Sequence, residues 1–320
     1  LRRYQRIDGH RSMAPSRRFR CNCHRVLRCL SIWPSGRSSL TLLQEVSVET
    51  FQEVLDFIQP EQVGRFWFRG NSIRPQMRIF GGQVLAQCLM AANQTIAEEM
   101  NAHSMHAYFL RAGDPNAPIE FEVDPIRNGR SFATRRVVAR QHDQAIFNTS
   151  ISYQVTEDGV GHSIDMPNVE IPEFNNQPEI DKNGKLRFPL LDRFAVERMR
   201  GAADRATGGK VVQNNWYRGK GVLRDDHRVH QAALALISDF SLLGTALGAH
   251  EVVDWERDFI LASLDHAIWF HAPINLNDTV LYHCDSPWSG NARGFNRGQF
   301  WSPDGVLLAS TTQEGLMRKK

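Results

Sequence analysis

One carboxylate in the sequence lies inside a long apolar run. Residues 229–247 read VHQAALALISDFSLLGTAL, a pattern that predicts a single helix buried on nearly every side. Asp239 interrupts this run, and its neighbours one helical turn away are apolar. Either the side chain reaches a solvated edge, or it has a hydrogen-bonding partner, because burying an unpartnered carboxylate costs several kcal/mol. A buried, partnered Asp is a type of residue that serves as a general base.

A second group of chemically capable residues is Ser263, Asp265 and His266, which have the content of a serine nucleophile site. If residues 261–270 form a strand, their side chains alternate, so Ser263 and His266 point to opposite faces. We therefore predict that they form no local dyad. The nucleophile elbow of α/β hydrolases is also missing, because residues 70–74 (GNSIR) lack its second glycine.

The overall composition is that of a globular protein with room for a large core. The 320 residues are 42% hydrophobic and 23% charged, enough for one large domain or two smaller ones. No run reaches the roughly 18 uninterrupted apolar residues of a membrane span, so we expect none. Beyond residue 44 the formal charge is −6, which does not indicate a nucleic-acid partner.

The N-terminal stretch differs from the remainder. Residues 1–44 contain ten Arg, no Lys and one acidic residue. This composition is typical of a mitochondrial transit peptide, and equally of a non-native extension, because the chain begins with Leu. We expect residues 1–46 to be a disordered or targeting extension. Three of the five Cys lie there, so the sequence predicts neither a disulfide framework nor a metal site.

An internal repeat indicates how the elements are arranged. Residues 105–113 (MHAYFLRAG) match residues 265–273 (DHAIWFHAP) at a separation of 160 residues. Each block follows an apolar helix, predicted at 84–96 and 229–247, and precedes three strand-like segments with alternating residues. These strands are predicted at 119–126, 131–141 and 145–155, and at 279–286, 292–301 and 305–314. The pattern favours two α+β units packed as a pseudo-dimer.

The remaining segments complete this outline. A helix is predicted at 48–58, a strand at 66–70 and a short helix at 190–200. Gly81 and Gly82 allow a tight start to the next helix, and they also leave backbone N–H groups open to a ligand. We place the first unit at 47–156, a linker at 157–208 and the second unit at 209–320. This last unit carries the candidate catalytic residues.

Seven segments are specific in their order and spacing. They are FRGNS, FGGQVLAQCLMAA, SMHAYFLRAGDPNAPIEFEV, RNGRSFATRRVVARQ, DDHRVHQAALALISDF, LDHAIWFHAPINLND and DGVLLASTTQEGLMR. From about residue 47 to 318 the chain resembles the type II acyl-CoA thioesterases, a family of bacterial enzymes and eukaryotic peroxisomal thioesterases. The resemblance implies an α+β double hotdog, in which each of two repeats has a long buried helix wrapped by an antiparallel sheet.

The resemblance also implies a reaction, the hydrolysis of fatty acyl-CoA to free fatty acid and CoA. The family uses an Asp, a Ser or Thr, and a Gln, which Asp239, Ser263 and Gln313 match in this chain. Direct attack by water needs a proton acceptor, which Asp239 supplies, while Gln313 and Ser263 offer donors and acceptors. Ala91 stands where counting places the equivalent of Asp239 in the first repeat. That repeat is then scaffold and part of the acyl or CoA groove.

Two departures from the family pattern affect these expectations. The family's strand with an Arg-Pro-Val-Glu-like motif before the second helix is not visible, so the second sheet is expected to lack a strand. The chain ends in Arg318-Lys319-Lys320 rather than a Ser-Lys-Leu-type peroxisomal signal, so either the targeting differs or the chain is truncated. The resemblance implies a peroxisomal location, and the Arg-rich N-terminus a mitochondrial one.

Two other functions remain open on the sequence alone. One is an enoyl-CoA hydratase-type hotdog enzyme, for which His230 and His250 are poor candidates because they lie at the ends of the predicted helix. The other is a non-catalytic acyl-CoA-binding protein. The expected partners are an acyl-CoA substrate and further copies of this chain, packed through the hotdog sheets. No cofactor is expected, because CoA is part of the substrate, and the residues that contact CoA are left unassigned.

Overall fold

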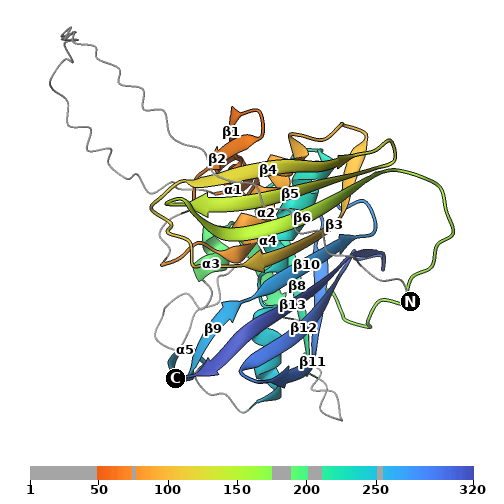
Figure 1. The fold of residues 1–320 in the computed structure, drawn as a ribbon. Coiled ribbons are helices and arrows are strands. Elements are labelled where there is room, and N and C mark those ends of the chain that lie inside the picture. The colour runs from red at the N-terminus through yellow and green to blue at the C-terminus, as the bar shows by residue number, and fades with distance from the viewer. Residues whose placement is uncertain (1–48, 74–76, 175–188, 201–210, 251–254) are drawn as a thin grey trace, which may run out of the picture. The chain divides into compact units, whose positions relative to one another are not determined.

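The computed structural model describes residues 49–320 except 74–76, 175–188, 201–210 and 251–254. The residues described belong to one compact unit (Figure 1). The predictions made for residues 1–46, including those for three of the cysteines, lie outside the described residues. Cys88 and Cys284 are free and buried.

The described residues form helices and strands in alternating groups. The helices are α1 (Phe51–Ile58), α2 (Gly81–Asn93), α3 (Pro189–Arg193), α4 (His227–Ser238), the 3-10 helix η1 (Leu243–Ala249) and α5 (Trp255–Asp258). The strands before α3 are β1 (Glu61–Gly64), β2 (Trp67–Gly70), β3 (Met100–Phe109), β4 (Ile119–Asn128), β5 (Phe132–Gln141) and β6 (Gln144–Val155). Those after α3 are β7 (Val196–Arg200), β8 (Val211–Gly219), β9 (Phe259–Ser263), β10 (Asp265–Phe270), β11 (Val280–Gly290), β12 (Arg293–Trp301) and β13 (Leu307–Lys319).

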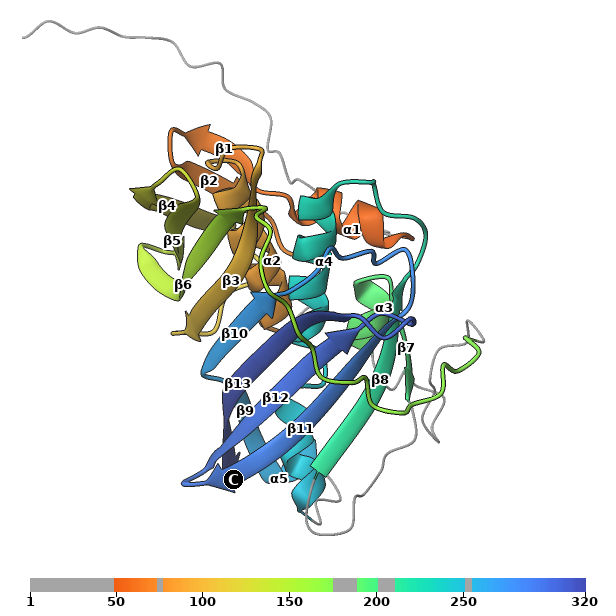
Figure 2. The ribbon, with the colours of Figure 1, turned by 90° about the vertical axis from the view of Figure 1, so that its right-hand side faces the viewer.

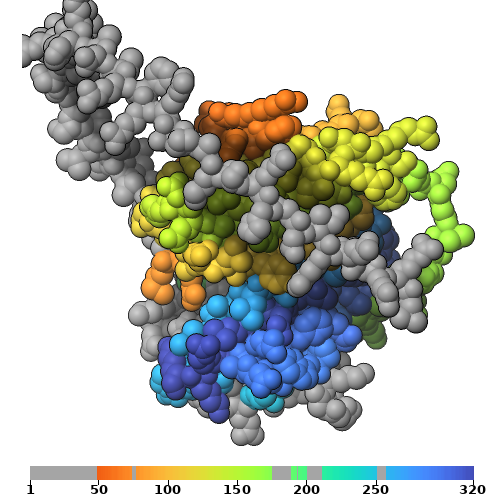
Figure 3. Space-filling model, in the orientation of Figure 1, coloured from red at the N-terminus to blue at the C-terminus, as the bar shows by residue number. Residues whose placement is uncertain are grey.

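The strands form one large sheet in which each half repeats the same connectivity. Their order is β1-β2-β4-β5-β6-β3-β10-β13-β12-β11-β8-β7, with β9 paired to β13. In each half two strands precede the long helix; four strands follow α2, and five follow α4 because β9 is additional. The halves join at β3 and β10. Figures 1 and 2 show α2 and α4 against the sheet, and Figure 3 shows the two halves as adjoining parts of the surface. The predicted α+β fold with a buried helix in each repeat is confirmed.

The register of the repeat differs by one residue from the sequence match. The backbone N–H of Asn116 donates to the side chain of Asp114, and that of Asn277 donates to the side chain of Asn275. These equivalent hydrogen bonds show that the two repeats are offset by 161 residues. His106 is therefore equivalent to Ala267, and these two residues face each other where β3 pairs with β10. The predicted match of His106 with His266 is wrong. Because side chains alternate along a strand, His106 is exposed and His266 is buried.

The second sheet does not lack a strand before its helix. β8 pairs with β11 and β7 pairs with β8, so these strands take the places that β2 and β1 take in the first half. The helix predicted at 190–200 is also wrong: α3 stops at Arg193, and positive φ at Ala195 turns the chain into β7. Both α3 and β7 lie in the segment 157–208 that we interpreted as a linker, and the boundaries of the two units stay a prediction.

The described part of this segment also runs across the outer face of the second half (Figure 2). Three side chains from 166–174 pack with Met199 and Leu307 on a small apolar cluster of buried side chains. The three are Met166, Val169 and Phe174, and the cluster consists of Trp216, Leu281 and Trp301. The connection between the halves therefore shields apolar residues that alternate with the main core along β8, β11 and β12.

The apolar run around Asp239 is not one continuous helix. α4 ends at Ser238, where Asp239 is the C-cap, and positive φ at Ser241 separates it from η1. The prediction of a single helix over 229–247 is therefore wrong. By length and composition, His227–Ala249 is apolar enough to cross a membrane, but 67% of its most apolar window is buried inside the protein, as in a core helix.

Candidate active site

The structure brings Asp239, Ser263 and Gln313 together. The Gln313 side-chain nitrogen, Nε2, lies 2.7 Å from Asp239 Oδ1 and 3.1 Å from Ser263 Oγ. Asp239 caps α4, Ser263 ends β9 and Gln313 lies in the middle of β13, which pairs with β9. Three elements of the second half thus converge on one amide group.

The carboxylate of Asp239 is buried and hydrogen-bonded at both oxygens. Gln313 donates to Oδ1, and the backbone N–H of Gly82 donates to Oδ2 over 3.0 Å. Its side chain is 7% exposed. Burial raises the pKa of Asp239 to about 6, while the hydrogen bonds from Gln313 and Gly82 act in the opposite direction. A carboxylate with this pKa is largely ionised at neutral pH and is a stronger base than an exposed Asp.

The first half contributes the two glycines at the start of α2. A Cβ on Gly81 would lie 2.6 Å from Asp239 Oδ2 and 2.8 Å from the Phe109 ring, so a side chain there would displace the carboxylate. A Cβ on Gly82 would lie 2.3 Å from the backbone oxygen of Leu236. The helix N-terminus, with its partial positive charge, therefore approaches the carboxylate closely.

The first half provides this N–H contact, and its helix α2 carries no counterpart of the carboxylate. Ala91, the residue matched to Asp239 by counting, is fully buried in α2. The candidate site therefore includes residues of both halves of the chain, rather than residues of the second half alone.

An irregularity between β9 and β10 turns Ser263 and His266 toward the same group. β9 pairs Ser263 with Gly315, and β10 pairs Ala267 with Thr312. From Ser263 to Ala267 the chain advances four residues, whereas the opposite strand, β13, advances three, from Thr312 to Gly315. The extra residue between β9 and β10 is a bulge. Because a one-residue shift reverses the faces, the prediction that Ser263 and His266 point in opposite directions is wrong.

His266 is a member of the site that sequence reasoning missed. Its Nδ1 lies 3.2 Å from Gln313 Nε2, and its Nε2 lies 2.9 Å from Ser238 Oγ. The side chain is fully buried, and burial lowers the pKa of His266 to about 3, so the ring is neutral. The sequence signal for His266 is a histidine among apolar residues, three positions after Ser263. A regular strand over 261–270 would place it on the face opposite Ser263, and the bulge removes that objection.

More hydrogen-bond acceptors surround the side-chain nitrogen of Gln313 than its two N–H groups can fully bind. Asp239 Oδ1, Ser263 Oγ and His266 Nδ1 all lie within hydrogen-bonding distance of Nε2. Its carbonyl oxygen, Oε1, is buried and has no hydrogen-bond donor among the residues that the structure describes. A buried acceptor of this kind requires a donor, and a bound water or substrate can supply one.

Other residues considered earlier lie elsewhere. His230 Nδ1 accepts a hydrogen bond from the backbone of Leu276, and His250 lies 3.0 Å from Ser289. No group of three His, Cys, Asp or Glu that could hold a metal ion occurs in the described part of the chain.

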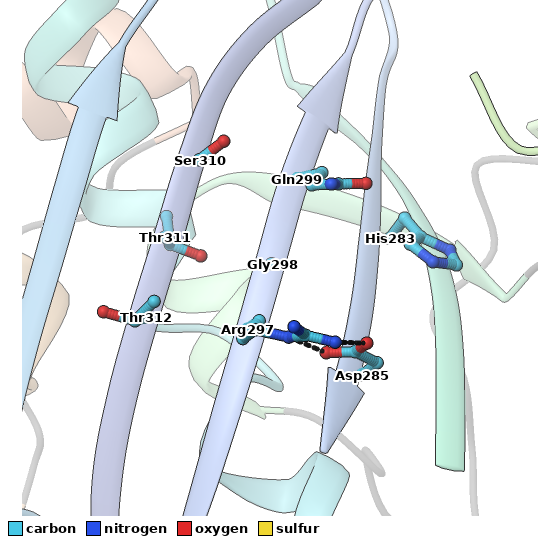
Figure 4. Close-up of a pocket in the computed structure, with 8 residues that line it drawn as sticks. All are labelled: His283, Asp285, Arg297, Gly298, Gln299, Ser310, Thr311 and Thr312. Carbon is cyan, nitrogen blue, oxygen red and sulfur yellow. Dashed lines mark hydrogen bonds and ion pairs between the residues drawn. The ribbon is translucent and has the colours of Figure 1, made fainter. Parts of the chain in front are cut away.

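A hollow of about 330 Å³ on the second half of the sheet is separate from this cluster (Figure 4). It is lined by residues of β11, β12 and β13, and its one arginine, Arg297, forms an ion pair with Asp285. Ser310 and Thr312 line it with half-buried side chains, and Thr311 contributes at its floor; Thr311 and Gln313 are buried on the face toward the helices. The hollow therefore lies across the sheet from Asp239.

Comparisons with known proteins agree with this architecture. Residues 190–316 match the family model described as acyl-CoA thioesterase, and residues 55–154 match the acyl-CoA thioesterase N-terminal domain. Acyl-coenzyme A thioesterase 8 of Homo sapiens is 37% identical over 79% of this chain and 85% of that protein. Acyl-CoA thioesterase 2 of Haemophilus influenzae is 37% identical over 84% of this chain and 98% of that protein.

A solved structure shows the same fold. An acyl-CoA thioesterase II from Mycobacterium marinum superimposes with a TM-score of 0.72 at 32% identity, covering 84% of this chain and 98% of that one. The repeated helix and sheet, the shared junction of the halves and the matches to both family models lead to one conclusion. The chain belongs to the acyl-CoA thioesterase family, has its double hotdog fold, and is a hydrolase of acyl-CoA thioesters.

Proposed function

We propose that this chain hydrolyses fatty acyl-CoA by direct attack of water, with Asp239 as the general base and Gln313 and Ser263 as its partners. The single observation that carries the proposal is the position of Gln313 Nε2, within hydrogen-bonding distance of both Asp239 Oδ1 and Ser263 Oγ. The names of the relatives support the substrate class.

In this mechanism Asp239 takes a proton from a water molecule while the water oxygen bonds to the thioester carbonyl carbon. The resulting tetrahedral oxyanion collapses, the carbon–sulfur bond breaks, and the CoA sulfur leaves as thiolate. The proton held on Asp239 neutralises the thiolate, so the products are a fatty acid and free CoA. The raised pKa of Asp239, about 6, suits both the acceptance and the return of this proton.

Gln313 and Ser263 position the groups that react. Gln313 holds the carboxylate through its N–H, and its Oε1, which has no donor among the described residues, is the acceptor that can orient a hydrogen of the water. Ser263 accepts a hydrogen bond from Gln313, so its own hydroxyl proton can be donated to the developing oxyanion. The assignment gives every polar atom of the cluster a partner during the reaction.

The main rival mechanism makes Ser263 a nucleophile that forms an acyl-enzyme. A serine nucleophile needs a base on its hydroxyl, but Ser263 Oγ contacts the donating amide of Gln313. His266 is also a poor base for this purpose, because burial lowers its pKa to about 3. Both features favour water attack.

The test is release of CoA from fatty acyl-CoA by purified protein, measured with a thiol reagent. Asp239→Asn should lower kcat by roughly 10²–10⁴-fold, the usual contribution of a positioned base. Gln313→Ala should also lower kcat, with a smaller change in KM. Asp285→Asn is the matched control, because this Asp lies across the sheet in the ion pair with Arg297, and it should leave kcat unchanged.

Mass spectrometry of enzyme quenched during turnover distinguishes the two mechanisms. Water attack predicts unmodified protein throughout the reaction. Acyl mass on Ser263, or near-normal kcat in Asp239→Asn, would overturn the proposal. Absence of any CoA release by the wild-type protein would instead favour the non-catalytic acyl-CoA-binding alternative.

A further inference from the structure

A directional chain of hydrogen bonds runs from the candidate active site into helix α4. It begins at Asp239, whose carboxylate can only accept hydrogen bonds when ionised. The Gln313 amide must therefore turn its NH₂ group toward Asp239 Oδ1, 2.7 Å away, because a flipped amide would place two oxygens against each other. This orientation also turns the NH₂ group toward His266 Nδ1, 3.2 Å away.

The orientation of Gln313 fixes the tautomer of the His266 ring. Since Nδ1 faces a donor, it must be the unprotonated nitrogen, and the single proton of the neutral ring lies on Nε2. That N–H points at Ser238 Oγ, 2.9 Å away. The Ser238 hydroxyl in turn donates to the backbone oxygen of Ala235 over 2.8 Å, which leaves its oxygen free to accept from the ring.

We propose that His266 is a positioning residue of this hydrolase, held as the Nε2–H tautomer between Ser238 and Gln313 so that Gln313 presents its Oε1 to the reacting water. This inference rests on the proposed function, and it assigns the ring no proton-transfer role. His266 acts on the reaction only through Gln313.

The geometry explains why such a support is needed. A Gln side chain has several rotatable bonds, and fixing it in one orientation costs conformational entropy. Asp239 and Ser263 accept from the same nitrogen as His266, and Oε1 has no donor among the described residues. Three acceptors around Nε2 therefore hold the amide in one orientation. Asp239 lies at the end of α4, Ser263 ends β9, and His266 is held to α4 through Ser238.

The decisive experiment measures the tautomer directly and does not depend on activity. Protein labelled with ¹⁵N in its histidines is studied at pH 7.5 by two-dimensional NMR that correlates ring nitrogens with ring carbon-bound protons. The His266 signals are assigned by their loss in His266→Asn. We expect a neutral ring with its proton on Nε2. A proton on Nδ1, or a charged ring, would overturn the inference even if the enzyme hydrolyses acyl-CoA as proposed.

Two substitutions test which ring nitrogen supports catalysis. In Asn the terminal atoms are as many bonds from Cβ as Nδ1 is, whereas in Gln they are as far as Nε2. His266→Asn can therefore still accept from Gln313, while His266→Gln can contact only Ser238. We expect kcat to fall about tenfold more in His266→Gln than in His266→Asn, with KM similar in both.

Equal kcat in the two variants, or a higher kcat in His266→Gln, would contradict the proposed role. Thermal unfolding of both proteins shows whether each is folded under the assay conditions. If neither variant folds, the His266 signals are assigned by their change in Ser238→Ala, which removes the partner of Nε2, and the NMR result on the wild-type protein still decides the inference. Complete absence of hydrolysis by the wild-type protein, with an Nε2–H ring, would refute the proposed function and leave the tautomer assignment standing.

Discussion

Asp239 shows how a single residue links stability to chemistry in this protein. Its carboxylate is almost fully buried, and its two hydrogen-bond donors, Gln313 and Gly82, only partly offset the loss of water. The pKa therefore rises to about 6, above the ordinary value of 3.8. The same burial that destabilises the charged form makes it a better proton acceptor near neutral pH.

The first prediction concerns the pH dependence of the reaction. If Asp239 is the base, only its ionised form supports hydrolysis, so kcat/KM should be level above about pH 7 and fall below about pH 6. The limiting slope should be tenfold for each pH unit. Initial rates from pH 4.5 to 8.5, with protein stability checked at each pH, give the profile. A level profile down to pH 5 would exclude a base with this pKa.

The second prediction concerns the stability of Asp239→Asn. Because the folded-state pKa is raised, folding favours the protonated carboxyl, and the cost of the charged form is absent below about pH 4 and complete above about pH 6. The shift corresponds to about 3 kcal/mol. The Asn variant should therefore unfold at a higher temperature than wild type at pH 8, and the difference should shrink toward pH 4.5. Equal melting temperatures at pH 8 would argue against a strained carboxylate.

At the scale of elements, the close approach of α2 to Asp239 yields the third prediction. Gly81→Ala should place its Cβ against Asp239 Oδ2 and the Phe109 ring, so kcat/KM should fall at least tenfold while the sheet stays folded. Gly244→Ala is the control, because nothing lies within 4 Å of a Cβ there. Steady-state kinetics and circular dichroism compare the two. Equal kinetics would show that α2 does not constrain the carboxylate.

Most elements could be predicted from sequence because their patterns are local. The six strands predicted after the two helices match β4, β5, β6, β11, β12 and β13 closely, since alternating residues and turn signals define each strand. The end of α4 could not be predicted, because the apolar pattern continues past Ser238 and only the positive φ of Ser241 breaks it.

The candidate site depended on information that no local pattern holds. The apolar surroundings of Asp239 indicate a special carboxylate, and the nearby His266 makes Ser263 a candidate nucleophile, but only the family resemblance groups Ser263 and Gln313 with Asp239. The bulge between β9 and β10 reversed the expected face of His266, because one extra residue changes the alternation of every side chain beyond it. Gly82 was noted only as a residue with an available N–H, and its bond to Asp239 spans 157 positions.

At the scale of the whole molecule, the fourth prediction is that residues 1–44 can be removed. Their charge and lack of apolar periodicity give them nothing to contribute to a core. The first described helix, α1, begins with its own capping box at Thr50 and Glu53, which the shortened chain keeps. The shortened chain should retain its melting temperature and kcat. A loss of several degrees would show that the removed residues contribute to the fold.

The candidate site takes one N–H group from the first half and one carboxylate from the second, so each chain builds one such site from both halves. A dimer of identical hotdog chains would hold two equivalent sites, whereas fusion lets each half specialise, and α2 carries no acidic residue. This protein should therefore bind one molecule of a non-hydrolysable acyl-CoA analogue per chain, as isothermal titration calorimetry can measure. Binding of two molecules per chain, the second lost on mutation of the first half, would show that both halves have kept a working site.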